Sequence, residues 1–362
     1  VPAQSSLLAQ LQQRARVWAD TADVTVVERL RRDLGVEDVT TNPSIVSAAA
    51  RRETRAVNGV GSVLLVEVGG HSRAISALKG HERIAVELGR RLLDSVPGRV
   101  CTQLDIRCSD AGEMVAKARG LMAMYTEAGV PRERVLIKTP ATWAGIRATD
   151  RLEREGIKCL VTLVCSEVQG RAAAEAGASV IATYVGRVSD WHKTAAAAAA
   201  AAEGITTTAD SLVAPAAPSA SEDPGVAMTL DLKKWFVAQG FATEVMAASF
   251  RNADQVAALA GCDHLTVAPG LLQDLAKLPP RDSLSAGIFS RRDGGGRAAP
   301  VSGPCDDTAA YNAAERLDEE AFLAALRQNV CGTEVLRSSV EGFARDTLAL
   351  EAAITEAQQY SS

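Results

Sequence analysis

Short apolar runs alternate with longer amphipathic stretches along most of the chain, and this alternation limits its fold more than any other feature. The runs suit buried strands, whereas apolar residues recur at every third or fourth position between them, as in helices. The eight candidate strands are Val17–Ala19, Val36–Thr40, Val100–Leu104, Val135–Ile137, Cys159–Val164, Val180–Val185, Glu244–Ala248 and His264–Val267. Helical patterns include Ile75–Leu93, Ala111–Ala128, Ala144–Glu155 and Glu167–Ala176. Eight such repeats favour an α/β fold closed into a (β/α)8 TIM barrel over an open sheet.

The length of 362 residues fits one such barrel, because this fold takes about 250 residues or more as a single unit. We therefore expect one barrel domain over residues 1–362. Two segments interrupt the alternation and predict flexible insertions: residues 194–224, a polyalanine tract that predicts a helix followed by a mobile loop, and the Gly-rich residues 289–307. Two helices, Asp318–Val330 and Glu334–Ala353, are expected to lie across the barrel, within residues 318–353.

The composition excludes several classes of protein. The chain carries 39 basic and 44 acidic side chains, a formal charge of −5, without a dense Lys/Arg block, which argues against a nucleic-acid partner. No apolar run reaches the roughly 18 residues that a membrane span needs. Seven cysteines without CxxC spacing indicate neither a disulfide framework nor a zinc site. We expect a soluble protein in a reducing compartment, the cytoplasm or the plastid stroma.

A bound metal ion is not expected either. The four histidines, His71, His81, His192 and His264, are scattered along the chain without the spacing of metal ligands.

The active-site residues of a closed barrel lie where its strands end, so the residue that ends each apolar run is the first candidate for a functional role. Lys138 ends the run Val135–Ile137. Burial of an ammonium group disfavours its charged form, so a buried lysine becomes a free amine that can attack a carbonyl and form a Schiff base. In the alternative interpretation Lys138 leans out of the strand to pair with a carboxylate or to reach solvent.

Other polar residues close neighbouring runs in the same way. Asp20 follows the first run, where it is either a functional carboxylate or the cap of a helix that begins near Ala22. Arg187, Ser249 and Arg251 close the sixth and seventh runs. Two guanidinium groups and a hydroxyl make a phosphate clamp, although the arginines would equally suit salt bridges at the rim.

Several segments together resemble the transaldolase family, from about Val17 to Ala353. They are Ala19–Asp23, Val39–Ser44, Val135–Thr139, Thr142–Arg147, Tyr184–Trp191, Glu222–Val226, Ala248–Asn252 and Leu259–Asp263. The resemblance implies a (β/α)8 barrel that needs no metal and no organic cofactor. It also implies a lysine that forms an imine with a ketose phosphate.

The matching motifs imply a role for each candidate residue. Lys138 forms the imine, and Asp20 takes the proton of the C4 hydroxyl as the C3–C4 bond breaks. The residues that position the dihydroxyacetone unit and a catalytic water are Thr40, Asn42 and Thr162. The residues that hold the terminal phosphate are Arg187, Ser249 and Arg251. Phosphate binding then orients the reacting carbons.

Four inner positions depart from the usual transaldolase pattern and resemble the related fructose-6-phosphate aldolases. These positions are Gln103, Leu160, Ala182 and Tyr184. A glutamine in the third strand cannot ionise, so Gln103 only orients the water by hydrogen bonds. The hydroxyl of Tyr184 would then protonate the enamine through that water, which favours release of free dihydroxyacetone.

Transaldolase activity is the leading prediction, with fructose 6-phosphate or sedoheptulose 7-phosphate as donor and an aldose phosphate as acceptor, in the non-oxidative pentose phosphate pathway. Transfer is favoured over aldol cleavage by the chain length, the C-terminal helices, Trp143 and the Asp190-Trp191 motif. The first alternative is a fructose-6-phosphate aldolase, and the second is a non-catalytic sugar-phosphate-binding barrel. Sugar phosphates are the expected partners, and the protein is expected to be a monomer or a homodimer.

Overall fold

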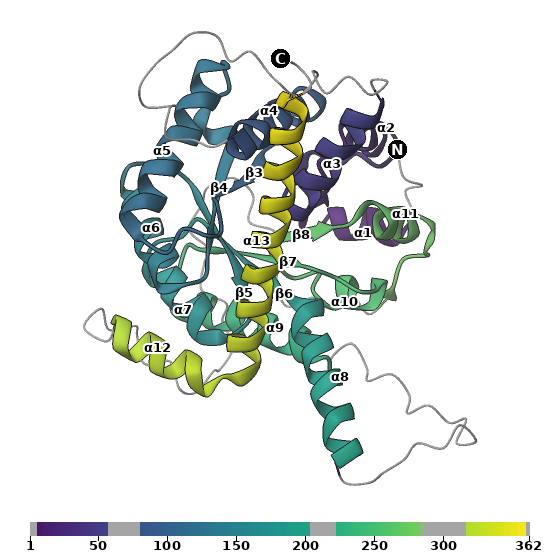
Figure 1. Ribbon diagram of the computed structural model, residues 1–362. Coiled ribbons are helices and arrows are strands. Elements are labelled where there is room, and N and C mark those ends of the chain that lie inside the picture. Colours follow the sequence, from purple (N-terminus) through teal and green to yellow (C-terminus); the bar gives the residue numbers. More distant parts are fainter. Residues whose placement is uncertain (1–5, 57–79, 203–221, 283, 285–315, 360–362) are drawn as a thin grey trace.

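The computed structural model describes residues 6–56, 80–202, 222–282, 284 and 316–359, and in them the chain forms a closed barrel of eight parallel strands (Figure 1). Each strand pairs with the next in the sequence, and β8 pairs back with β1. The strands are β1 Arg16–Asp20, β2 Asp38–Thr40, β3 Val100–Gln103, β4 Val135–Pro140, β5 Cys159–Val164, β6 Val180–Tyr184, β7 Glu244–Ala248 and β8 His264–Val267. The predicted TIM barrel is confirmed.

Helices follow the strands in turn and surround the barrel (Figure 1). They are α2 Val24–Leu34, α3 Pro43–Ala56, α4 Gly80–Ser95, α5 Ala111–Glu127, α6 Trp143–Arg154, α7 Glu167–Glu175, α8 Val185–Ala202, α9 Pro224–Ala238, α10 Ala253–Ala258 and α11 Pro269–Lys277. A short helix, α1 Leu7–Gln12, precedes β1 and packs against α11. Strand β4 is longer than predicted, so Lys138 lies within the strand and not after it.

Helix α2 shows how local sequence sets an element's ends. Asp23 precedes it, and the carboxylate of Asp23 accepts a hydrogen bond from the backbone N–H of Val26 at 3.0 Å, which caps the first turn. Gly35 ends the helix with φ of 69°, a conformation that glycine adopts without strain. The capping role that was the alternative for Asp20 therefore belongs to Asp23, and Asp20 remains in the sheet.

Inward-facing side chains fill the barrel in layers. One layer is apolar and consists of Trp18, Cys101, Leu136, Leu160, Ala182 and Met246, with Val180 packed beneath Ala182 in the same cluster. Side chains alternate between the two faces of a strand, so the residues two positions later point inward in the next layer, nearer the carboxyl ends. That next layer includes Asp20, Gln103, Lys138, Thr162 and Tyr184. Packing of the apolar layer thus places five of the predicted site residues at one end of the barrel.

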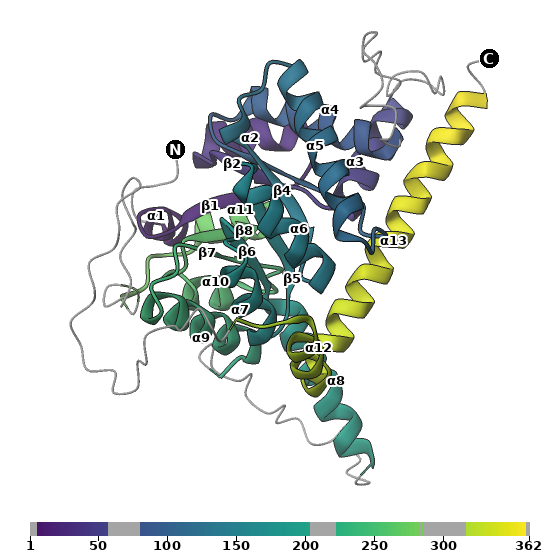
Figure 2. The ribbon, with the colours of Figure 1, turned by 90° about the vertical axis from the view of Figure 1, so that its left-hand side faces the viewer.

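Two C-terminal helices complete the described chain, α12 Glu319–Gln328 and α13 Val330–Gln359. Helix α13 has 30 residues, which makes it about 45 Å long. It crosses one end of the barrel (Figures 1 and 2) and contacts α3 and α4 on one side and α8 and β5 on the other. Helix α12 packs against α7 and α6 instead. Only the second of the two C-terminal helices therefore lies across the barrel.

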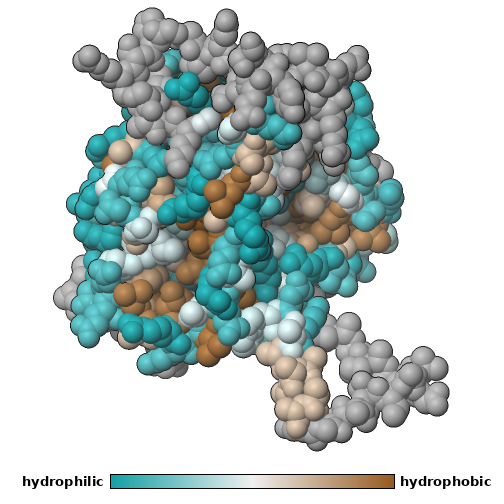
Figure 3. Space-filling model, viewed as in Figure 1, coloured by the Kyte–Doolittle hydropathy of each residue, from teal (hydrophilic) through white to brown (hydrophobic). Residues whose placement is uncertain are grey.

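The first predicted insertion is partly helical, because residues 194–202 form the end of α8, which stands clear of the body (Figure 3). Residue 224 begins α9, while residues 203–221 lie outside the described part of the chain, as do all of residues 289–307. Within the described ranges no helix is long and apolar enough to span a membrane.

Candidate active site

Lys138 lies inside the barrel near the carboxyl end of β4, where the residue is 4% exposed. Its Nζ donates a hydrogen bond to the backbone oxygen of Thr41 at 3.0 Å. It pairs with no carboxylate among the residues that the structure describes. The alternative interpretation, a lysine that leaves the strand for solvent or for an acidic partner, does not describe this residue.

Asp20 ends β1 directly opposite Thr40 of β2. The Thr40 hydroxyl donates to Oδ1 of Asp20 at 2.8 Å and lies 2.5 Å from the hydroxyl of Thr266. Because a hydroxyl has one proton, Thr40 accepts from Thr266 when it donates to Asp20. Burial raises the pKa of Asp20, although the nearby charge of Lys138 and the hydrogen bond from Thr40 both lower it. A carboxylate with a raised pKa is a stronger base than an ordinary aspartate.

Gln103 lies opposite Lys138 in the register of β3 and β4. It is 9% exposed, and neither amide atom has a hydrogen-bond partner among the described residues. A buried amide is satisfied in nearly all proteins, so these two atoms are available to a water or a substrate. Gln103 also lines a cavity of about 30 Å³, room for one or two water molecules.

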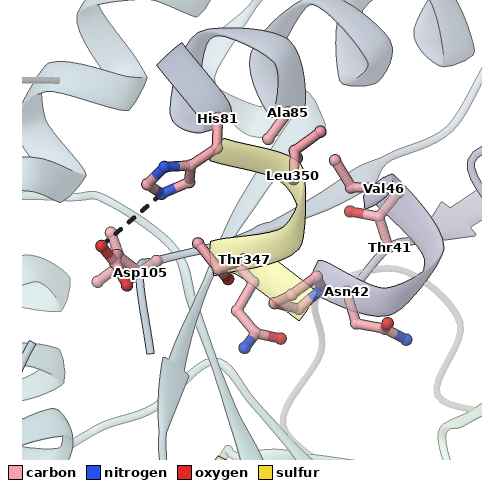
Figure 4. Close-up of a pocket in the computed structure, with 11 residues that line it drawn as sticks. Thr41, Asn42, Val46, His81, Ala85, Asp105, Thr347 and Leu350 are labelled. Carbon is pink, nitrogen blue, oxygen red and sulfur yellow. Dashed lines mark ion pairs between the residues drawn. The ribbon is translucent and has the colours of Figure 1, made fainter. Parts of the chain in front are cut away.

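The walls of this cavity come from both the barrel and the crossing helix (Figure 4). Asn42 lines it from the turn after β2, and Thr347 lines it from α13. The carbonyl oxygen of the Asn42 amide accepts from the backbone N–H of Ile45 at 3.1 Å, so it caps α3. Only the NH2 group of Asn42 is left as a donor for a ligand.

Thr162 and Tyr184 meet on neighbouring strands. The Thr162 hydroxyl, fully buried on β5, donates to the Tyr184 hydroxyl at 3.2 Å. The next residue, Leu163, has φ of 65°, at the point where the register between β5 and β6 shifts. A leucine in this conformation is strained, and such strain clusters at functional sites.

Ser249 and Arg251 form one unit at the end of β7. The Arg251 guanidinium donates to the backbone oxygen of Ser249 at 2.7 Å and to its hydroxyl at 3.2 Å. It also pairs with Asp190 at 2.8 Å, so the interpretation as a rim salt bridge holds for Arg251. Both partners are exposed, and an exposed pair contributes little stability and exchanges readily for another anion.

Arg187 differs from Arg251 in that it forms no ion pair with any described residue. It lies in the first turn of α8, next to Gly186. A Cβ atom at Gly186 would lie 2.1 Å from the backbone oxygen of Ser249, so glycine is needed for the start of α8 to approach the end of β7 this closely. The two predicted phosphate-binding segments are thus brought together.

One group in the described ranges has the geometry for a metal ion, with ligand atoms of His81, Glu82 and Asp105 within 4.8 Å of one another. Both carboxylates already have cationic partners, because Lys117 binds Glu82 at 2.9 Å and Arg107 binds Asp105 at 2.7 Å. The two cations compensate the charge that a metal ion would otherwise balance.

The predicted residues therefore all lie at the carboxyl ends of the strands or in the turns that follow. Residues that contact them and that sequence reasoning missed include Thr266 and, on the crossing helix, Ser339 and Phe343. Thr266 had a signal, since it stands two positions after His264 in the β8 run. The other two are on α13, and no local pattern marks them.

The fold is that of the (β/α)8 barrel enzymes, whose active sites lie at the carboxyl ends of the strands. Residues 17–354 match the family model described as Transaldolase/Fructose-6-phosphate aldolase. A transaldolase of Marinomonas sp. (strain MWYL1) is 35% identical over 348 residues, covering 96% of this chain and 98% of the relative. A transaldolase of Vibrio campbellii (strain ATCC BAA-1116) is 40% identical over 272 residues, covering 75% of this chain and 79% of the relative.

The chain belongs to the transaldolase/fructose-6-phosphate aldolase family. The predicted membership, and with it the prediction of an enzyme of the transaldolase family, is confirmed.

Proposed function

We propose that this enzyme transfers a dihydroxyacetone unit from fructose 6-phosphate or sedoheptulose 7-phosphate to an aldose phosphate. The observation that carries the proposal is the Lys138 amine, buried at the carboxyl end of the barrel and without a carboxylate partner in the described chain. Family membership and the relatives named transaldolase support it.

The first half of the reaction breaks the donor sugar. The Lys138 amine attacks the C2 carbonyl, and loss of water with uptake of one proton leaves an imine that is protonated on nitrogen. The Asp20 carboxylate takes the C4 hydroxyl proton, the C3–C4 bond breaks, and its electron pair moves into the imine to give an enamine and a free aldose phosphate. The raised pKa of Asp20 supports this step because a stronger base takes the proton more readily.

The second half reverses these bonds with a new aldehyde. The enamine carbon attacks the acceptor carbonyl, Asp20 returns its proton to the new hydroxyl, and water hydrolyses the imine to free Lys138. We assign the orientation of the C1–C3 unit and the water to Thr40, Asn42, Gln103, Thr162 and Tyr184. The substrate phosphate would be bound by Arg187, Ser249 and Arg251, where an anion displaces Asp190 from Arg251.

Trapping of the imine tests this proposal. Incubation with fructose 6-phosphate and borohydride is expected to leave a reduced adduct on Lys138, located by peptide mapping. Lys117 and Lys233 are equally buried but ion-paired, so they serve as internal controls that stay unmodified. Folded protein without an adduct on Lys138 would contradict the mechanism.

Aldol cleavage is the second candidate, favoured by the hydrogen bond between Thr162 and the Tyr184 hydroxyl and by the non-ionisable Gln103. Water then protonates the enamine in place of attack on an acceptor, and hydrolysis releases dihydroxyacetone. Fructose 6-phosphate without an acceptor should give free dihydroxyacetone, and Tyr184→Phe should lose most of that activity while it keeps transfer. If Tyr184→Phe released dihydroxyacetone as fast as the unaltered protein does, aldol cleavage would be excluded.

A non-catalytic sugar-phosphate-binding barrel is the remaining alternative, and it predicts that Lys138→Ala binds fructose 6-phosphate as the unaltered protein does. We further propose a monomer or homodimer in the cytoplasm or plastid stroma. The six described cysteines, all free and buried, support a reducing compartment. Sedimentation of the purified chain decides its oligomeric state.

A further inference from the structure

The guanidinium of Arg187 is held from the far end of the sequence, by α13. Its Nη1 donates a hydrogen bond to the hydroxyl of Ser339, which is fully buried. The same hydroxyl donates to the backbone oxygen of Val335 at 2.5 Å. Because its single proton is committed to Val335, the Ser339 oxygen is left to accept from Arg187. The serine is thus fixed as an acceptor for one edge of the guanidinium.

Two aromatic rings flank the same group. The guanidinium carbon of Arg187 lies 5.3 Å from the ring centre of Tyr184 and 5.3 Å from that of Phe343 on α13. Phe343 is 2% exposed, so this contact is largely shielded from water. Cation–π attraction restrains the plane of the guanidinium, while its remaining N–H groups stay available as donors.

Helix α13 is itself anchored beyond these contacts. Arg107, in the turn after β3, donates to both carboxylate oxygens of Glu351 at 2.8 Å. A bidentate pair fixes direction as well as distance. The segment that carries Ser339 and Phe343 therefore lies at a set height over the barrel end.

We propose that Ser339 and Phe343 are positioning residues that aim the Arg187 guanidinium at the phosphate of the substrate, so that α13 sets the selectivity for phosphorylated sugars. The inference rests on the proposed function, which makes Arg187 a phosphate contact. Absence of an ion pair to Arg187 within the described residues supports it, because the positive charge is kept for an external anion.

Steady-state kinetics of Ser339→Ala and Phe343→Leu test the proposal, with inorganic phosphate as a competitive inhibitor. Loss of a hydrogen bond to a charged group weakens binding by about tenfold or more. We therefore expect the KM for fructose 6-phosphate and the Ki of phosphate to rise about tenfold in Ser339→Ala. A rise of about threefold is expected in Phe343→Leu from the lost cation–π contact. The kcat should change less than about twofold in both, since the reacting carbons lie elsewhere.

Ser338→Ala is the matched control. The Ser338 hydroxyl donates to the same Val335 oxygen, at 3.2 Å, and forms no hydrogen bond with Arg187, so both constants should stay unchanged. Ser339→Thr keeps the hydroxyl and should restore most of the affinity. If Ser339→Ala and Phe343→Leu behave like Ser338→Ala, or lose kcat and thermal stability without a change in KM, the inference is wrong.

Arg187→Ala separates this result from the proposed function. An unchanged KM and phosphate Ki in Arg187→Ala would show that Arg187 does not bind the phosphate, so that part of the proposed function fails. A large rise in Arg187→Ala, without a rise in the α13 variants, would overturn only the inference.

Discussion

Replacing Thr40 by valine should move the acidic side of the pH profile upward. The Thr40 hydroxyl donates to the Asp20 carboxylate at 2.8 Å in a fully buried position, and this bond lowers the pKa of Asp20. A hydrogen bond to a charged group contributes about 1.5–3 kcal/mol. One pKa unit corresponds to about 1.4 kcal/mol. Thr40→Val should therefore raise the pKa of Asp20.

The assay is kcat/KM for fructose 6-phosphate, measured from about pH 4.5 to pH 9. In the proposed mechanism Asp20 acts only when ionised, so the pH at which activity is half lost on the acidic side should rise, by about one pH unit for each 1.4 kcal/mol that the bond contributes. Loss of the positioning role proposed for Thr40 should lower activity at every pH alike, and it does not move this midpoint.

Thr102→Val is the matched control for this experiment. Thr102 is a buried threonine on β3, and its hydroxyl is hydrogen-bonded to Tyr125 at 2.6 Å, away from Asp20. Its profile should keep the acidic limb of the unaltered enzyme. An unshifted limb in folded Thr40→Val, or the same shift in Thr102→Val, would refute the argument.

Three further changes give distinct outcomes. Asp20→Asn should be inactive yet more stable than the unaltered protein near pH 7. Burial raises the pKa of Asp20, so folding favours its protonated form. The gain in stability, measured by urea unfolding, should therefore vanish below about pH 4. Asp223→Asn should lower the free energy of unfolding by about 1–3 kcal/mol near pH 7. Burial disfavours the Asp223 carboxylate, but hydrogen bonds from Ser189 and Gln255 outweigh burial and lower the pKa of Asp223. Calorimetry should therefore show that the difference in stability shrinks as the pH falls below about 4. Burial raises the pKa of the Cys101 thiol to about 12, so iodoacetamide at about pH 8 should leave Cys101 unmodified until the protein unfolds.

The barrel was predictable because strand and helix periods are local properties of the sequence. The run that ends in Lys138 marked both a strand and its candidate functional residue, although the last three residues of β4, Lys138 to Pro140, fell outside the apolar pattern. Asp20 and Asp23 satisfy the same capping rule, and only the position of the first turn decides between them. Local patterns resolve the element but not always its boundary.

Contacts across the sequence were not predictable in the same way. Arg187 and Ser339 are 152 residues apart, and the amphipathic pattern of α13 gives a helix without saying which surface it covers. The same limit explains the error for α12, which has an apolar face that packs on the outer ring and not over the barrel end. Gln103 stood out because it departs from the usual transaldolase pattern, whereas its unpaired amide emerges only from the packed structure.

The position of α13 also sets the order in which the enzyme becomes competent during its own synthesis. All eight strands have been translated by residue 267, whereas α13 ends at residue 359. At ordinary elongation rates the ribosome needs roughly 5 to 20 s for that interval. A nascent barrel therefore has Lys138 and the three proposed phosphate-binding residues before α13 restrains Arg187, and a product that stops short of α13 would lack that restraint.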